Sequence, residues 1–241
     1  MDNIILEALP ESRIFYNMAS VLEFLIFCGG YDCKSGAACY DLWSYNTISG
    51  VLKQYYPPTG QGYIYWYPKI CTYGNKVYIC DDPIIHDDNP NSNSSIFSFN
   101  VIDGNWEILY KHYEGCDDNK LPRMSIQLFF YHNESLYIYG TLLNDDLSND
   151  LEYSGVDDNS IRNSRLVIYK FCVKRAMWSR VEQIGAKPTL RGRVPGSIFK
   201  NQYYCKVNRL YIFHHEIDTP NKFREVWIFN FCTKTWTKRE T

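Results

Sequence analysis

The side chains best able to do catalytic chemistry are scattered along this chain of 241 residues. Its five histidines fall on four separate segments: His86, His112, His132, and the pair His214 and His215. The sequence has no glycine-rich phosphate loop, no G-x-S-x-G elbow and no H-E-x-x-H zinc motif. The adjacent histidines would point to opposite faces of a strand, so they would not readily share a metal. We therefore expect no catalytic residue, no metal site and no cofactor.

The nine cysteines do not form the closely spaced pairs that bind zinc, because Cys28, Cys33 and Cys39 are too far apart for a C-x2-C motif. Several others lie in or beside alternating apolar runs, where a reduced thiol behaves as a small buried hydrophobe: Cys80, Cys172, Cys205 and Cys232. We interpret the cysteines as structural.

The beginning of the chain, MDNIILEALPESR, lacks the basic segment of a secretory signal. The longest apolar runs, such as 24–28, are far shorter than the roughly 20 residues that a membrane helix needs. We expect a cytoplasmic protein, with the nucleus as the alternative location, and no membrane partner.

A repeat of strand pairs organises the chain. Aromatic residues make up 17% of it, a bias typical of half-buried strands. Four segments read as a strand, a short turn and a second strand: 40–55, 94–109, 165–181 and 224–239. In the second and fourth copies an asparagine precedes a tryptophan by six positions, as Asn100 does Trp106. Asn46 precedes Leu52 by the same spacing, and Trp178 follows what reads as a slightly longer turn.

Each of these pairs is preceded by another pair of apolar runs, beginning near Arg13, Lys69, Ser125 and Ser197. Four strands, named a, b, c and d in chain order, are therefore expected to recur four times. The predicted units are 11–56, 66–110, 124–182 and 196–239, within one domain spanning 1–241. Counted from Leu52 through Trp106 and Trp178 to Trp236, the repeat intervals are 54, 72 and 58 residues.

The first unit carries Cys28-Gly29-Gly30 followed by Tyr40-Asp41-Leu42-Trp43. This resembles the kelch repeat, in which an apolar strand, a Gly-Gly pair, a variable loop and aromatic-rich strands recur about every 50 residues. The resemblance implies an all-β, kelch-type β-propeller with four recognisable four-stranded blades, closed atypically or incomplete. The positions that match the Gly pair elsewhere are Asp81-Asp82, Gly140-Thr141 and His214-His215, which leaves close backbone approach unsupported in those copies.

Closure has two readings. Residues 3–9 resemble the end of a d strand that would complete the blade holding Trp236. Alternatively, the chain is a fragment or shortened relative of a longer propeller, with open edges. The first copy also resembles kelch substrate receptors of Cullin-RING ubiquitin ligases, which implies an adaptor role with cullin-ligase components as partners.

Loop length differs between the two ends of the predicted blades. The a-b and c-d turns read as short and polar, with a-b turns at 17–20, 73–76, 132–135 and 206–209. Gly50 and Gly104 stand where a hairpin favours positive φ. The long connections are the b-c loops at 31–39, 81–93, 141–164 and 214–223 and the d-a loops at 57–63, 111–123 and 183–194. Because b-c and d-a connections share one end of a blade, this face is the predicted recognition surface.

Charge is unevenly distributed along the sequence. Residues 81–161 hold 16 acids and three bases, a net of −13, whereas residues 162–241 hold 17 bases and five acids, a net of +12. Such asymmetry can steer a partner onto a surface, or it can simply keep two faces solvated. The acidic segment would repel phosphates, so we expect no nucleic-acid partner.

These features predict a non-enzymatic module that binds a protein or peptide through its loops. Three loop arginines, Arg123, Arg191 and Arg193, would hold acidic side chains or a C-terminal carboxylate. Tyr31, Tyr63 and Trp66 are candidate aromatic contacts, with packing between blades as the alternative role. The alternative function is a kelch-fold oxidoreductase or sugar-acting enzyme with a site in the central channel.

Overall fold

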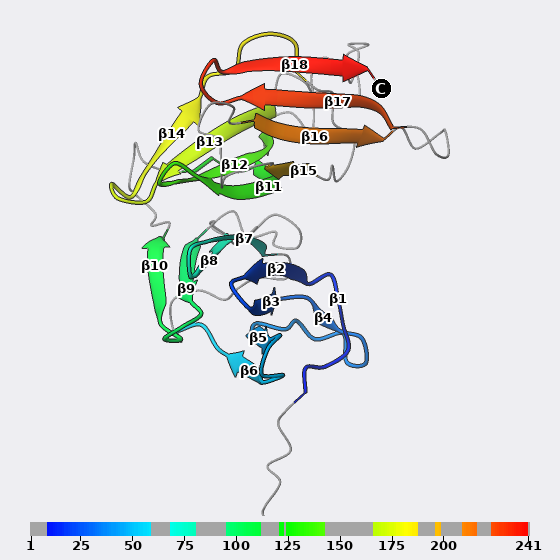
Figure 1. The fold of residues 1–241 in the computed structure, drawn as a ribbon, viewed down its shortest axis with the longest axis vertical. Coiled ribbons are helices and arrows are strands. Elements are labelled where there is room, and N and C mark those ends of the chain that lie inside the picture. The colour runs from blue at the N-terminus through cyan, green and yellow to red at the C-terminus, as the bar shows by residue number, and fades with distance from the viewer. Residues whose placement is uncertain are drawn as a thin grey trace, which may run out of the picture. The chain divides into compact units, whose positions relative to one another are not determined.

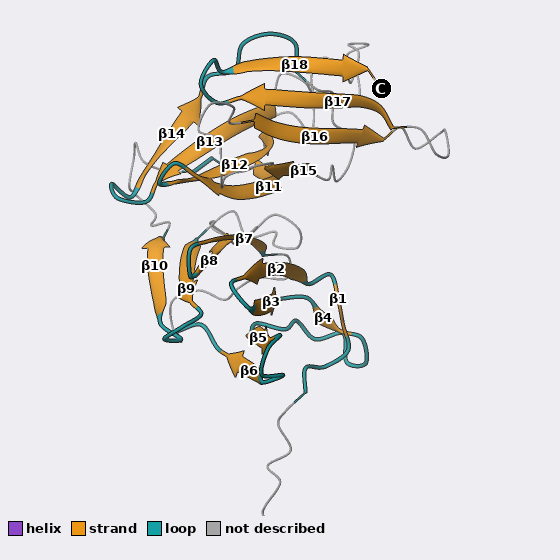
Figure 2. Cartoon of the chain, in the orientation of Figure 1, coloured by secondary structure: helices purple, strands orange, loops and turns teal. Residues whose placement is uncertain are grey.

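The protein is described by a computed structural model (Figure 1). It describes residues 9–58, 68–80, 95–111, 121–122, 124–142, 166–187, 196–198, 209–215 and 223–240. Within these ranges the regular elements are all β-strands, which confirms the all-β class (Figure 2). A helix long and apolar enough to cross a membrane is not found in these ranges. The chain divides into two compact units, Met1–Asp118 (unit 1) and Asn119–Thr241 (unit 2).

Unit 1 contains two four-stranded antiparallel sheets in which neighbours in space follow chain order. The first sheet consists of β2 (Asn17–Val21), β3 (Phe24–Cys28), β5 (Leu42–Asn46) and β6 (Leu52–Tyr55). The second consists of β7 (Lys69–Tyr73), β8 (Lys76–Cys80), β9 (Ile96–Asn100) and β10 (Trp106–Tyr110). A further pair, β1 (Arg13–Ile14) and β4 (Tyr31–Asp32), forms a two-stranded sheet.

Unit 2 repeats the same topology in two more sheets. The third sheet consists of β11 (Met124–His132), β12 (Ser135–Leu142), β13 (Leu166–Cys172) and β14 (Met177–Val181). The fourth consists of β15 (Gly196–Ile198), β16 (Arg209–His215), β17 (Phe223–Asn230) and β18 (Thr235–Glu240). The prediction of four sheets, each with four antiparallel strands, is confirmed.

Expected boundaries were wrong for two kinds of connection, the first a-b turn and the b-c loops. The first a-b turn is at residues 22–23, because residues 17–20, expected to turn, lie inside β2. Thr141, His214, His215 and Phe223 belong to strands and not to the long b-c loops. In both cases β structure extends further than turn-forming or polar residue types suggested.

The c-d turns share one backbone design in all four sheets. A residue four positions after the end of strand c has positive φ: Gly50 (74°), Gly104 (73°), Ala176 (51°) and Lys234 (58°). In three of the turns the asparagine that ends strand c accepts hydrogen bonds from backbone N–H groups two or three residues later: Asn46, Asn100 and Asn230. Such turns are the usual role of asparagine beside a hairpin.

The third turn is no longer than the others, contrary to expectation. Cys172 occupies the place of the asparagine, and Trp178 follows it by the same six positions. The length of the turn is thus the same in all four sheets, although the third turn has Cys172 in place of the asparagine and Ala176 in place of the glycine.

Aromatic pairs start strand d in three sheets with nearly the same geometry. Each tryptophan lies opposite a phenylalanine of strand c in register. The ring centroids are 4.9 Å apart for Phe99 and Trp106, 5.0 Å for Phe171 and Trp178, and 5.0 Å for Phe229 and Trp236, with interplanar angles of 50°, 51° and 48°. In the first sheet the pair is Tyr45 and Leu52.

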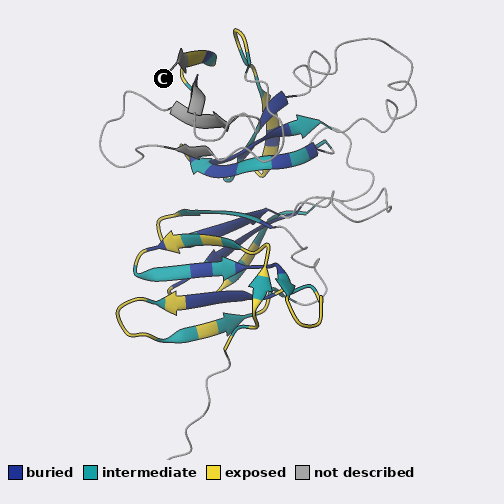
Figure 3. Cartoon of the chain, turned by 90° about the vertical axis from the view of Figure 1, so that its right-hand side faces the viewer, coloured by how far each residue is buried: buried dark blue, intermediate teal, exposed yellow. Residues whose placement is uncertain are grey.

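Each unit has its own apolar core between two sheets. In unit 1, Ile26 and Leu42 of the first sheet pack with Val77, Phe97 and Phe99 of the second. In unit 2 the core joins the third and fourth sheets and includes Tyr139, Ile168, Trp227, Phe229 and Trp236. Buried positions follow the strands, while the turns of unit 1 are exposed (Figure 3).

The two sheets of unit 1 meet along their a strands, β2 and β7. The side chain of Asn17 donates to the carbonyl of Pro68 at 2.5 Å, and Thr72 Oγ1 donates to the carbonyl of Ser20 at 2.9 Å. The contact partner moves from Pro68 to Thr72 as β2 is followed from Asn17 to Ser20, so the two a strands run in the same direction. The a-b and c-d turns of both sheets therefore lie at one end of unit 1, and the b-c connections at the other.

Candidate functional site

The first b-c connection, expected to be a loop, folds as a small ribbon in which β4 pairs with β1 and is joined to residues 37–39 by an isolated bridge between Tyr31 and Ala38. On one side of β4, the Cys33 N–H donates to the Ser12 carbonyl at 2.7 Å, extending the β1–β4 pairing. On the other side, the Asp32 N–H donates to the Ala37 carbonyl at 2.9 Å, and the Cys39 N–H donates to the Gly30 carbonyl at 2.8 Å. We call residues 12–14, 30–33 and 37–39 the ribbon. Its backbone is fixed by ladder hydrogen bonds, which makes it a defined surface.

The tip of the ribbon is closed by the Asp32 side chain. Its carboxylate accepts hydrogen bonds from Ser35 Oγ at 2.5 Å, and from the N–H groups of Lys34 and Ser35 at 3.1 Å. These hydrogen bonds, chiefly the one from the Ser35 hydroxyl, lower the pKa of Asp32. The tip therefore keeps its shape while the carboxylate is ionised.

Gly30 lets the ribbon lie directly against the strand before β2. It has a φ of +93°, and a Cβ at this position would come within 2.6 Å of the Ile14 carbonyl oxygen. Only glycine fits both the conformation and the space. The second glycine of the Gly-Gly pair thus makes the close backbone approach that the sequence led us to expect.

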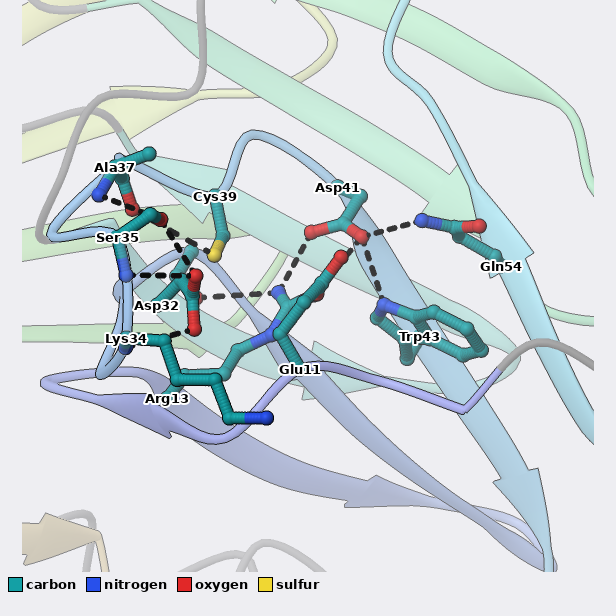
Figure 4. A network of polar contacts seen from close by, with 11 residues as sticks. Glu11, Arg13, Asp32, Lys34, Ser35, Ala37, Cys39, Asp41, Trp43 and Gln54 are labelled. Carbon is teal, nitrogen blue, oxygen red and sulfur yellow. Dashed lines mark hydrogen bonds and ion pairs between the residues drawn. The ribbon is translucent and has the colours of Figure 1, made fainter.

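A buried ion pair anchors the ribbon to the first sheet (Figure 4). The Arg13 guanidinium donates to both oxygens of Asp41, with Nη1 to Oδ1 at 2.6 Å and Nη2 to Oδ2 at 2.9 Å. Asp41 Oδ2 also accepts from Trp43 Nε1 at 2.7 Å and from Gln54 Nε2 at 2.6 Å. Arg13 further donates to Glu11 at 2.7 Å. This network ties residues from the ribbon, β5 and β6 into one unit.

Burial by itself would lower the pKa of Arg13 and raise that of Asp41, since it disfavours both charged forms. Their mutual hydrogen bonds and charges outweigh it, so the pKa of Arg13 is raised and that of Asp41 is lowered. Burial also raises the pKa of the neighbouring Cys39 thiol, in spite of the Arg13 charge. The carboxylate is fully occupied by its partners, so the pair serves to hold the ribbon and not to act as an acid or base.

Apolar side chains are exposed at the end of the ribbon's first segment and on the two residues that follow it. Ile14, Phe15 and Tyr16 each expose about half of their surface. The Phe15 ring meets the ring of Tyr31 edge to face, with centroids 6.4 Å apart. We call Ile14, Phe15, Tyr16 and Tyr31 the aromatic patch. Aromatic rings held on a rigid backbone supply large contact area at little entropic cost, which is why they are enriched at binding hot spots.

Phe15 has a φ of 60°, a conformation rare for a bulky residue. The conformation costs roughly 1–2 kcal/mol relative to glycine. It persists because β1 pairs with β4 and β2 pairs with β3, which fixes the chain on both sides of Phe15. Strain of this kind clusters at binding sites.

Of the candidate binding residues proposed from the sequence, Tyr31 lies in β4 as part of the aromatic patch. The others lie outside the described residues: Arg123, Arg191, Arg193, Tyr63 and Trp66. So do residues 3–8 of the expected closing strand. The structure therefore brings one of the six candidates to the described site.

Sequence reasoning missed Phe15 and the Arg13–Asp41 pair. Residues 13–28 read as two continuous strand runs, and nothing in the residue types marks the break at Phe15. The single available signal was the aspartate between Tyr40 and Leu42, a charge at the start of a strand that is otherwise buried.

Comparison with known proteins adds no family assignment, since no protein-family model and no curated protein matches this chain. Among the described side chains, no three of His, Cys, Asp or Glu are grouped to hold a metal ion.

Proposed function

We propose that this protein is a non-enzymatic binding module that holds a protein or peptide partner against the aromatic patch. The observation that carries this proposal is Phe15, a large apolar side chain kept half exposed on a strained backbone next to Tyr31. A side chain with no role outside the fold would gain nothing from such a conformation.

The proposal extends to the architecture. We infer that the four sheets are blades of a kelch-type propeller, closed atypically or incomplete. Support comes from the a-b-c-d order in every sheet, the parallel a strands of unit 1, and the tight approach at Gly30. On this architecture the aromatic patch lies at the b-c end of its blade, where a propeller presents its loops.

An adaptor role in ubiquitin ligation follows from the kelch resemblance alone. The arginines Arg123, Arg191 and Arg193 would then add recognition of acidic side chains or a C-terminal carboxylate. Replacing all three with alanine should weaken partner capture while leaving the melting temperature nearly unchanged.

The aromatic patch is tested by Phe15→Asn combined with Tyr31→Thr. Asparagine tolerates positive φ and threonine suits a strand, so the fold should be retained. The matched control is Tyr56→Thr, which removes an exposed aromatic side chain outside the patch. Each protein is immobilised and presented with cell extract, and separately with arrays of acidic, C-terminal-carboxylate and neutral peptides.

The patch variant should lose the partners or peptides that the parent and the Tyr56→Thr control retain. An unchanged set of partners on a folded patch variant would overturn the assignment. If the parent prefers peptides with carboxylates and the variant with alanine at Arg123, Arg191 and Arg193 does not, the proposed role of these arginines is supported.

A further inference from the structure

A second surface, at the opposite end of unit 1 from the aromatic patch, is formed by the short turns. We call residues 22–23, 47–51, 74–75 and 101–105 the turn face of unit 1. The turns of each sheet are joined, because the Thr47 N–H donates to the Glu23 carbonyl at 2.9 Å and the Val101 N–H donates to the Asn75 carbonyl at 3.0 Å. The four turns therefore form two joined pairs, one in each sheet, at the same end of unit 1.

Isoleucines stand at the tips of this face. Ile48 is 84% exposed and Ile102 is 62% exposed, and Leu22 is exposed beside them. The equivalent position two residues after the end of strand c is Lys174 in the third sheet and Cys232 in the fourth. The turn itself therefore does not require an apolar side chain at this position. Exposed apolar side chains that the fold does not need often mark a surface that binds another molecule.

The corresponding turns of unit 2 are basic. We call the described residues 133–134, 173–176 and 231–234 the turn face of unit 2. They lie at one end, because the ring of Phe231 stacks on that of His132 beside the β11–β12 turn, with centroids 5.1 Å apart. This face carries Lys174, Arg175 and Lys234, of which Lys174 pairs with Glu134 at 2.8 Å and Lys234 with the adjoining Glu182 at 3.2 Å in exposed ion pairs. Exposed Met177 and Ile184 adjoin it.

The turn face of unit 1 has the complementary character. Its ionisable side chains are Glu23 and Asp103, with no base. Counted over whole units, residues 1–118 hold 15 acids and 6 bases, a net of −9, and residues 119–241 hold 12 acids and 19 bases, a net of +7. A turn face with apolar tips and the two acids Glu23 and Asp103 thus matches basic turns bordered by Met177 and Ile184.

We infer that the turn face of unit 1 binds the turn face of unit 2 on a second copy of this chain. The contact is heterologous, since different surfaces meet, and it gives a closed dimer if both contacts form at once or a longer chain if they do not. It uses neither the aromatic patch nor the loop arginines, so it can fail while the proposed partner binding holds.

The first test is the mass of the full chain in solution, measured by sedimentation across a range of protein concentrations and salt. The parent should exceed its monomer mass of 28.4 kDa as concentration rises. Association should weaken with added salt, because salt screens the charges at the edge of the contact. A parent that remains a monomer at every concentration would overturn the inference.

The decisive variants each remove one side of the contact. Ile48→Lys with Ile102→Lys introduces the residue that the third turn already carries at that position, so the turns should still form. Lys174→Gln, Arg175→Gln and Lys234→Gln together neutralise the other side. Each variant should associate more than about tenfold more weakly than the parent, because the first sets lysine charges against the basic face and the second removes the charges that attract the acidic face. Tyr56→Lys, an equally drastic change outside both turn faces, should associate like the parent.

Mixing the two variants distinguishes a contact between the unit 1 and unit 2 turn faces from a contact between two copies of the same face. The isoleucine variant retains an intact unit 2 face and the glutamine variant an intact unit 1 face, so an equimolar mixture should form a dimer although each alone does not. A glutamine variant that still associates alone would show contact between two unit 1 faces and contradict the inference. Circular dichroism and melting curves of each variant establish that its fold is retained.

Discussion

Arg13 and Asp41, which are 28 positions apart in sequence, form a two-pronged ion pair in which both side chains are almost fully buried, at 3% and 6% exposure. Glu11, Trp43 and Gln54 complete the network. The pair connects the ribbon that carries the aromatic patch to the sheet beneath it. This buried charge contact therefore supports the position of the patch together with the strand pairing on both sides of Phe15.

Replacing Asp41 with asparagine should destabilise unit 1 severely. The amide would face the Arg13 donors without a charge, and loss of one partner of a buried ion pair costs about 3–5 kcal/mol. Urea unfolding monitored by tryptophan fluorescence measures this loss. Arg13→Met and the double variant complete a thermodynamic cycle, and additive losses would show that the two side chains do not interact.

The Arg13–Asp41 pair also predicts that the stability of the folded protein falls at low pH. Asp41 has a pKa below its ordinary value of 3.8 in the folded protein, so the folded state binds this proton less readily than the unfolded state. Its stabilising contribution is complete above the ordinary value and is lost as pH falls through the folded value. The difference in stability between parent and Asp41→Asn should shrink below pH 3.8, and a constant difference down to pH 2 would contradict this origin.

The positive φ values in the c-d turns predict opposite effects on the free energy of unfolding when alanine replaces glycine and when glycine replaces alanine. Gly50→Ala introduces a side chain at a φ of 74° and should destabilise by about 1 kcal/mol. Ala176→Gly at the equivalent place, where φ is 51°, should stabilise by up to about 1 kcal/mol, because relief of the left-handed strain exceeds the entropy gained by the unfolded chain. Thermal unfolding measures both. Gly36, which has a positive φ outside these turns, provides a Gly→Ala control of similar size.

Much of the fold could be predicted because local chemistry repeats. Asparagine at the end of strand c, glycine four positions later and tryptophan at the start of strand d mark the same hairpin several times. Where a marker was substituted, as at Cys172 and Ala176, the turn kept its conformation because strand pairing on both sides imposes it. The sequence therefore misled us about turn length in the copy whose capping side chain had changed.

The site was harder to predict because it depends on contacts between distant segments. The ribbon forms through hydrogen bonds between distant residues, such as that from Cys33 to Ser12, and no local sequence pattern predicts them. The polar residues 32–36 read as loop, although the Asp32 side chain makes them a compact tip. Of the residues that form the patch, Tyr31 was selected for its place in a b-c connection, whereas Phe15 read as part of a strand.

The tryptophans that start strand d predict a graded loss of stability. Trp236 packs against Phe229 and Tyr139 and donates Nε1 to Gln183 Oε1 at 2.9 Å. Trp236→Leu copies the residue of the first repeat and should cost about 3 kcal/mol from lost ring contacts and an orphaned amide. Leu52→Ala, at the equivalent but less buried place, should cost less. Equal losses in urea unfolding would show that the positions are not ranked by burial and aromatic pairing.

Close backbone approach also occurs in the third sheet, at Gly140, where the sequence had left it unsupported. A Cβ at Gly140 would overlap the Ser125 carbonyl oxygen and would also lie 2.8 Å from the Met124 methyl carbon. The backbone oxygen cannot move without disturbing the β11–β12 pairing, which already shifts register between Ile126 and Leu128. Gly140→Ala should therefore destabilise by at least about 2 kcal/mol, as overpacking in a rigid core does. Gly74→Ala, where a Cβ meets open space but φ is 62°, should cost only about 1 kcal/mol. If the two variants unfold at the same urea concentration, the steric contact with Ser125 is not what requires glycine at Gly140, which has no positive φ.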